Sequence, residues 1–189
     1  MRVAIAAAAL ALLLAGCNQQ AATTDAEGPA GPQLAAPAPE TEPSRVFAPA
    51  NDAATAATGQ LNVAITLRLP DASDANLDAQ ETLTLTGANG VILEAQITGA
   101  ISPATQVQGQ TLRALLNIPV EEPQVLIYRV TNETKPNGRG VCGEETPGHI
   151  VLWEPSGPGE AGMKLLGVAG GAPGAADARA CPMLEYRRS

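Results

Sequence analysis

The sequence predicts an all-β protein: a small antiparallel β-sandwich or barrel of about seven or eight strands, held by one disulfide. Three observations support this prediction. From residue 61 onward, apolar and polar residues alternate in short runs, and turn residues separate these runs at similar spacing. No segment repeats apolar residues every 3.6 positions, so little helix is expected outside the N-terminal leader.

The first predicted strands carry the clearest alternation. Residues 61–69 place Leu, Val or Ile at every odd position, with more polar residues between them. Residues 81–87 and 91–98 also alternate, and Asn89-Gly90 lies between them. Asn-Gly between two alternating runs is a strong hairpin signal, because both residues tolerate positive φ. We therefore expect these two strands to pair.

The later strands are shorter or less regular. The strand at 124–131 is apolar on both faces, which indicates a central position in the sheet. Pro119 stops the strand that precedes it, because proline cannot donate to the ladder of a sheet. The further expected strands are residues 111–118, 124–131, 149–154, 162–168 and 182–187.

Two cysteines remain within the expected folded part, Cys142 and Cys181. Two thiols in an exported domain usually form a disulfide. Metal binding or a reactive thiol pair is the weaker interpretation, because the chain has no Cys-x-x-Cys motif and only one histidine. We therefore predict a structural disulfide between Cys142 and Cys181.

The first 17 residues carry a separate signal. Arg2 is followed by an apolar run of 12 residues, 3–14. A membrane-spanning helix needs about 20 apolar residues, so this run fits the hydrophobic part of a secretory leader. The run ends in Leu14-Ala15-Gly16-Cys17, which resembles the lipobox of bacterial lipoproteins. An ordinary secretory leader with an incidental cysteine is the alternative.

The resemblance to bacterial lipoproteins implies a membrane anchor. In that family the cysteine thiol receives a diacylglyceryl group, the leader is removed, and the acyl chains, palmitate among them, hold the protein to lipid. Here residues 1–16 would be the leader and Cys17 the lipidated first residue, whose acyl chains make the membrane a partner. The family's sorting rules, with Asn18 after the cysteine, favour the outer membrane, with the domain facing the periplasm.

Composition divides the rest of the chain into two parts. Residues 17–57 are rich in Ala, Pro, Thr, Gln and Gly, and offer little that a core could bury. Such a segment is expected to be a disordered tether. The β-domain is therefore predicted to begin at residue 58 and to run to residue 189.

Charge excludes one class of partner. The formal net charge is −8, and removal of Arg2 with the leader makes the mature chain −9. Phosphate backbones repel a negative protein, so nucleic-acid binding is not expected. No motif for a cofactor is present, and none is predicted.

The few aromatic residues are the candidate binding residues. Trp153, Tyr128 and Tyr186 would form an exposed patch for a partner or a glycan if they lay together on the surface. More often such residues fill the edge of a core. Both interpretations stay open from the sequence.

Candidates for catalysis and metal binding are weak, so no catalytic residue and no metal ligand is predicted. His149 has no accompanying nucleophile motif. The pairs Glu121-Glu122 and Glu144-Glu145 are neighbours in sequence, and such side chains point apart in extended chain. Asp74-Ala75-Asn76-Leu77-Asp78 begins like a calcium loop but lacks the Gly and Glu that an EF-hand requires.

A second resemblance concerns the start of the β-domain. Leu69-Pro70-Asp71, followed by Leu83-Thr84-Leu85, resembles the pattern of the YbaY/YscW-type lipoprotein domains. Those domains are small β-sandwiches with a Leu-Pro-led acidic loop between two strands. The resemblance implies a sandwich and a role in assisting assembly, whereas the half with the disulfide departs from that pattern.

Together these features predict a lipid-anchored envelope protein whose β-domain is not an enzyme. The domain is expected to bind an envelope protein or polymer, or to assist its assembly. Two alternatives remain: an inhibitor or stress-protective lipoprotein, and a hydrolase of envelope polymer.

Overall fold

The computed structural model describes residues 38–70, 79–155 and 162–189. Within these ranges, no helix is long and apolar enough to cross a bilayer. The elements are β1 (Glu40–Thr41), β2 (Arg45–Pro49), α1 (Asp52–Ala57), β3 (Leu61–Arg68), β4 (Gln80–Gly87), β5 (Ile92–Ile101), β6 (Gln106–Val107), β7 (Gln110–Thr111), α2 (Leu112–Leu116), β8 (Val125–Thr134), β9 (His149–Trp153), β10 (Gly162–Ala169), β11 (Arg179–Ala180) and β12 (Leu184–Arg188).

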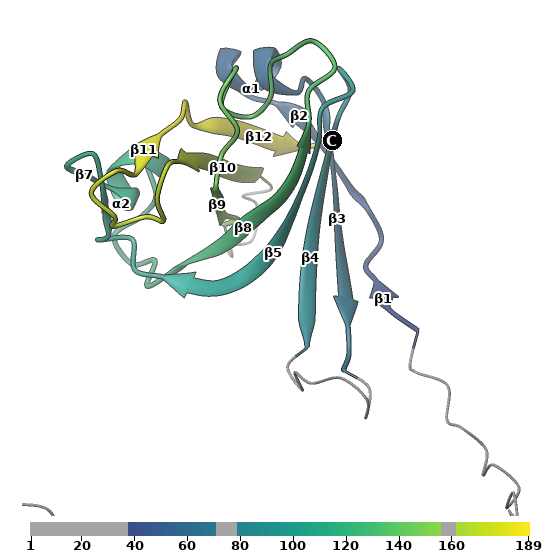
Figure 1. Cartoon of the computed structure of the whole chain (residues 1–189), viewed down its shortest axis with the longest axis horizontal. Coiled ribbons are helices and arrows are strands. Elements are labelled where there is room, and N and C mark those ends of the chain that lie inside the picture. Colours follow the sequence, from purple (N-terminus) through teal and green to yellow (C-terminus); the bar gives the residue numbers. More distant parts are fainter. Residues whose placement is uncertain (1–37, 71–78, 156–161) are drawn as a thin grey trace, which may run out of the picture. The chain divides into compact units, whose positions relative to one another are not determined.

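Eight of the described strands form a closed antiparallel barrel. Each pairs with the next in chain order, from β2 through β3, β4, β5, β8, β9 and β10 to β12. The pairing of β12 with β2 closes the barrel (Figure 1). The predicted all-β fold is confirmed, and of the two expected forms the structure has the barrel.

The hairpin predicted around Asn89-Gly90 is confirmed. β4 and β5 pair with Leu85 opposite Leu93, and the Gly87 N–H donates to the Val91 carbonyl at 2.8 Å. Only Gly90 takes a positive φ, 88°. The Asn89 side chain instead accepts the Val91 N–H and donates to the Ala57 carbonyl at 2.9 Å. The turn is thereby tied to α1.

The barrel interior is filled mainly by aliphatic side chains. On each strand the inward residues are the apolar members of the alternation, as on β3, β4 and β5. An eight-stranded barrel is just wide enough for such a core or for one small ligand. The buried interior residues include Phe47, Leu61, Val63, Leu83, Leu85, Leu93, Ala95, Tyr128, Ile150, Leu152, Met163, Leu165, Leu184 and Tyr186.

The folded part begins before residue 58, so the boundary expected from the sequence is wrong. β2 lies between β3 and β12, and Phe47 is 2% exposed in the core. α1 follows directly, with Asn51 accepting the Ala54 N–H at 2.9 Å as its N-cap. The apolar periodicity of the sequence did not indicate these elements, because β2 has only five residues and α1 packs through alanines.

The two ends of the barrel differ. At the end named here the helix end, α1 inserts Ala54 into the core beside the β4–β5 turn. At the other end, named the cavity end, β3, β5 and β9 finish and β4, β8 and β10 begin. β1 pairs with the last part of β3, Glu40 opposite Leu67, so the chain enters the fold at the cavity end.

Residues 111–118, expected as a strand, contain helix α2. Thr111 accepts the Ala114 N–H at 3.2 Å as N-cap, and Asn117 ends the helix in the left-handed conformation. Leu112 and Leu116 are buried at i, i+4 spacing. Short apolar runs do not separate a helix from a strand by periodicity, which explains the error.

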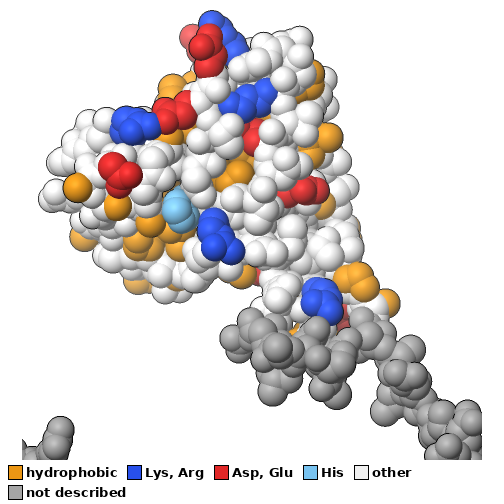
Figure 2. Space-filling view, viewed as in Figure 1, with side chains coloured by type: hydrophobic (Ala, Val, Ile, Leu, Met, Phe, Trp, Pro, Cys, Tyr) orange, Lys and Arg blue, Asp and Glu red, His pale blue; other side chains and the backbone are white. Residues whose placement is uncertain are grey.

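α2 belongs to an outer layer that covers β9 and β10. Leu112 and Leu116 pack with Val151 and Leu166, which point away from the barrel interior. In Figure 2, apolar side chains gather over the part of the molecule where α2 and β11 lie in Figure 1. The barrel wall is therefore apolar on both faces at β9 and β10.

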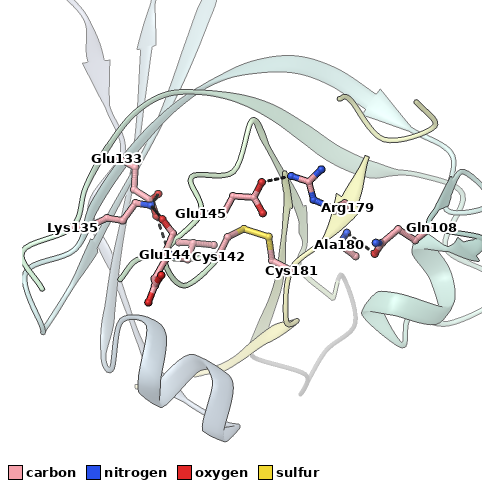
Figure 3. Close-up of a disulfide and its surroundings, with 10 residues drawn as sticks. Gln108, Glu133, Lys135, Cys142, Glu144, Glu145, Arg179, Ala180 and Cys181 are labelled. Carbon is pink, nitrogen blue, oxygen red and sulfur yellow. Dashed lines mark hydrogen bonds and ion pairs between the residues drawn. A yellow bond between two sulfur atoms is a disulfide. The ribbon is translucent and has the colours of Figure 1, made fainter. Parts of the chain in front are cut away.

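The predicted disulfide joins Cys142 to Cys181, with a Cα–Cα distance of 5.2 Å. It links the β8–β9 connection to the segment before β12 (Figure 3). Gly167 lies beneath the bridge, where a Cβ would overlap the Cys142 Sγ. The absence of a side chain at Gly167 therefore makes room for the disulfide.

A buried carboxylate organises the loop that carries Cys142. The Glu133 side chain is fully buried, and its Oε1 accepts the Val141 N–H at 2.8 Å. Lys135 Nζ lies 3.5 Å from Glu133 Oε2 and donates to the Glu144 carbonyl at 2.7 Å. In Figure 3 these contacts lie to the left of the disulfide, and the Arg179–Glu145 ion pair lies above it.

Candidate functional site

The cavity end of the barrel contains a cavity of about 370 Å³. Small-molecule sites in proteins typically begin near this size. The wall combines aliphatic side chains with several ionisable ones, in contrast to the apolar interior. The lining residues are Arg45, Ile65, Glu81, Glu122, Gln124, Val125, Leu126, Tyr128, Leu152, Trp153 and Glu154.

Arg45 and Glu154 form an ion pair in this wall. The Arg45 guanidinium, on β2, donates to the Glu154 carboxylate that follows β9. The same guanidinium lies 5.7 Å from the centre of the Phe47 ring. Because the two side chains are only 24% and 30% exposed, the cavity holds this pair partly out of water.

Tyr128 and Glu81 form a second polar pair. The Tyr128 hydroxyl donates to Glu81 Oε1 at 2.7 Å across the cavity end, from β8 to β4. Tyr128 is 0% exposed. Burial, reinforced by the hydrogen bond to Glu81, raises the pKa of Tyr128 far above its usual value. The phenol is therefore a neutral donor at every physiological pH.

Trp153 closes the outer side of the cavity. Its indole N–H donates to Glu122 Oε2 at 3.0 Å. Lys164 Nζ lies over the ring of Trp153, 5.4 Å from its centre. The same nitrogen is 3.9 Å from Glu185 Oε1. Trp153 thus stands between the described cavity and an adjacent hollow of about 320 Å³ that Lys164 and Glu185 line.

The three aromatic residues named from the sequence do not form an exposed patch. Tyr128, Trp153 and Tyr186 are 0%, 8% and 2% exposed. Tyr128 and Trp153 meet at the cavity, but the Tyr186 hydroxyl lies 2.7 Å from Thr58 Oγ1 in the core. Burial raises the pKa of Tyr186 to about 12. All three side chains are thus buried, and two of them, Tyr128 and Trp153, also line the cavity.

Sequence reasoning missed Arg45, Glu81 and Glu154. The sequence does contain a signal for these three residues, because each falls at the alternate positions that face the barrel interior. Glu81 is in phase with the inward residues of β4, Glu154 with those of β9, and Arg45 with Phe47 on β2. An ionisable residue in phase with a buried row, at the end of that row, points into the barrel mouth.

One member of each acid pair has a side-chain partner. Glu122 contacts Trp153 in the cavity, whereas Glu145 pairs with Arg179 on the surface, both side chains 50% exposed. Among residues 38–70, 79–155 and 162–189, no group of three or more metal-ligating side chains lies close enough to hold an ion. The Asp74 to Asp78 segment lies outside the described residues.

His149 begins β9, away from the cavity end. Its Nδ1 is buried without a hydrogen-bond partner in the structure. Burial, and to a lesser degree the charge of Arg129, lowers the pKa of His149 below its usual value. The folded protein therefore favours the neutral imidazole.

This shift predicts a pH dependence of stability. Because the pKa is lowered on folding, the unfolded chain takes up the proton first as pH falls through about 6.5. We expect the unfolding midpoint of the wild type to fall more between pH 7.5 and pH 5.5 than that of His149→Gln. Thermal unfolding of both proteins at the two pH values measures the difference, and equal decreases would contradict the prediction.

Comparison with protein-family models, with curated proteins and with solved structures finds no match to this chain. The resemblances to lipoproteins and to YbaY/YscW-type domains therefore stay predictions. What the geometry itself offers is a half-enclosed cavity with apolar walls and paired polar groups. Such a combination suits the binding of a small molecule or of a side chain of a larger partner.

Proposed function

We propose that this chain is a lipid-anchored protein of the bacterial cell envelope whose barrel binds an envelope component at its cavity end. The proposed anchor rests on the leader and on Leu14-Ala15-Gly16-Cys17. The Cys142–Cys181 disulfide supports it, because such bridges persist in oxidising compartments and are rare in the cytosol.

The cavity is the observation that carries the binding role. Ionisable side chains inside a barrel end lose hydration, and apolar residues would stabilise the fold at least as well. At the helix end the barrel is closed in this way by apolar residues, Ala54 and its neighbours. Retention of Arg45, Glu81 and Glu154 at the cavity end is therefore best explained by a ligand that contacts them.

Binding is better supported than hydrolysis. A glycosidase needs one carboxyl group to give a proton and a second to act as base or nucleophile. Here Glu154 is held by the Arg45 guanidinium, and Glu81 already accepts the Tyr128 hydroxyl. Glu122 likewise accepts the Trp153 indole N–H, so each carboxylate that lines the cavity has a partner that orients it for recognition.

Site-specific photo-cross-linking in intact cells tests the proposal. Leu126 lines the cavity and is 38% exposed, whereas Ile92 is 37% exposed and begins β5 at the helix end. A benzophenone amino acid at position 126 is expected to capture an envelope component in at least about fivefold higher yield than the same residue at position 92. The two sites are matched in exposure, so random collisions should label them equally.

Equal or absent capture at both positions would contradict a binding role for the cavity. Capture from position 92 alone would move the binding surface to the helix end, and would equally contradict it. A Tyr128→Phe variant provides the internal control. It keeps the ring in the core but removes the hydroxyl that orients Glu81, so capture from position 126 should decrease.

A further inference from the structure

The charges that line the cavity are unbalanced. Three carboxylates, those of Glu81, Glu122 and Glu154, face one guanidinium, that of Arg45. The guanidinium is already paired with Glu154. The cavity therefore carries a surplus of negative charge.

The two remaining carboxylates have only neutral donors as direct partners among the described residues. Glu81 accepts the Tyr128 hydroxyl, and Glu122 accepts the Trp153 indole N–H. Arg113 approaches Glu122 but donates to its backbone carbonyl, at 2.9 Å, and to that of Pro119. Within the part of the chain that the structure describes, neither carboxylate forms a salt bridge.

The segments next to the cavity end add no compensating cation in sequence. Residues 71–78, between β3 and β4, contain three aspartates and no Lys or Arg. Residues 156–161, between β9 and β10, contain one glutamate and no Lys or Arg. Arg68 at the end of β3, and Arg187 and Arg188 at the end of β12, lie toward this end of the barrel, but none of them lines the cavity. The surplus of negative charge therefore belongs to the cavity lining itself.

The rest of the wall is apolar. Ile65, Val125, Leu126 and Leu152 face the same space as the carboxylates. Leu152 and Val125 are 3% and 2% exposed, while Leu126 is open to solvent at the rim. A ligand that fills this space must therefore present both a hydrocarbon part and a polar part.

We propose that the cavity binds an organic cation, with a primary ammonium group between Glu81 and Glu122 and an apolar body against the aliphatic wall. This rests on the proposed binding function and specifies its ligand class. An ammonium supplies three donors for the free lone pairs of the two carboxylates. In a partly enclosed cavity this attraction is screened less than on the surface.

Titration of the mature, lipidated protein in detergent with three probes that share one phenylethyl body tests the charge preference. The probes are 2-phenylethylamine, 2-phenylethanol and 3-phenylpropionate, which end in a cation, a neutral hydroxyl and an anion. Fluorescence reports binding directly, because Trp153 is the only tryptophan and lines the cavity. We expect saturable binding of the amine, at least about tenfold tighter than that of the other two.

Substitution of the carboxylates tests the placement. Glu81→Gln and Glu122→Gln keep an amide oxygen that accepts the Tyr128 or Trp153 hydrogen bond, so the fold should persist. Each is expected to weaken amine binding about tenfold. Glu144→Gln is the matched control, because Glu144 is an exposed carboxylate outside the cavity and its removal should change the affinity less than about twofold.

Equal affinity for all three probes, or no binding of any, would overturn the cation assignment. So would an unchanged affinity in both cavity variants. These results are distinguishable from failure of the binding role itself. If position 126 still captures a component in cells while the amine does not bind, the binding role stands and only the ligand class is wrong.

Discussion

Loss of the Cys142–Cys181 disulfide is expected to lower the free energy of unfolding by about 4 kcal/mol. The bridge closes a loop with a sequence separation of 39 residues. In the chain-entropy model, opening such a loop releases conformational freedom mainly in the unfolded state. Domains of this size are typically stable by about 5–15 kcal/mol, so the bridge would account for a large share.

Denaturant unfolding of the wild type and of Cys142→Ala/Cys181→Ala measures this effect. The double variant avoids a lone reactive thiol, and it should unfold at a much lower denaturant concentration. Addition of reductant should shift the wild type toward the variant but leave the variant itself unchanged. A double variant as stable as the wild type would mean that Glu133, Lys135 and the Arg179–Glu145 pair hold the loop without the bridge.

The all-β fold was predictable because the sequences of β3 and β4, eight residues each, alternate between apolar and polar residues. On β3 and β4 the buried leucines and valine, Leu61, Val63, Leu83 and Leu85, recur at every second position, so the period of two identifies both the strand and its inward face. The Asn89-Gly90 turn then fixes which strands pair. Closure of the sheet was left open, because it depends on β2, whose pairing with β12 joins residues 47–49 to 186–188.

The elements that sequence reasoning missed are those whose local pattern is weak. α1 buries only Ala54, so its residues resemble the Ala-rich stretch before them. α2 is five residues long, too short for its periodicity to differ from that of a strand. In both cases tertiary contacts with the barrel, rather than local preference, determine the structure.

The residues of the candidate site were also only partly predictable, because tertiary structure brings them together. The few aromatic residues were the candidate binding residues, and two of them, Tyr128 and Trp153, do line the cavity. The charged residues beside them come from β2, from the start of β4 and from the end of β9, which are distant in sequence. Only closure of the barrel brings them together, so their convergence follows from topology.

Closure also relates the site to the proposed anchor. β1 enters the fold at the cavity end, where Glu40 lies opposite Leu67 of β3. Cys17 precedes this point by about twenty residues, and an extended segment of that length reaches on the order of 60 Å. The proposed anchor thus joins the fold through β1, the strand that enters at the cavity end.

Substitution of Cys17 by Ser is expected to release the protein from the membrane fraction almost completely. Each buried methylene contributes about 0.8 kcal/mol to membrane binding, so two or more acyl chains anchor a protein durably, whereas a net charge of −9 on the mature chain gives no attraction to anionic lipid. Fractionation of cells that express the wild type or Cys17→Ser measures the change, and mass spectrometry of the product checks acylation directly.

The disulfide cysteines supply the matched control for this experiment. Cys142→Ala/Cys181→Ala removes the two disulfide cysteines but leaves Cys17, so this variant should remain with the membrane even though it is less stable. Membranes washed at high salt separate acyl anchoring from surface adsorption, because only the latter is screened. If Cys17→Ser still sediments with washed membranes, some other part of the chain holds it there, and the lipoprotein assignment is wrong.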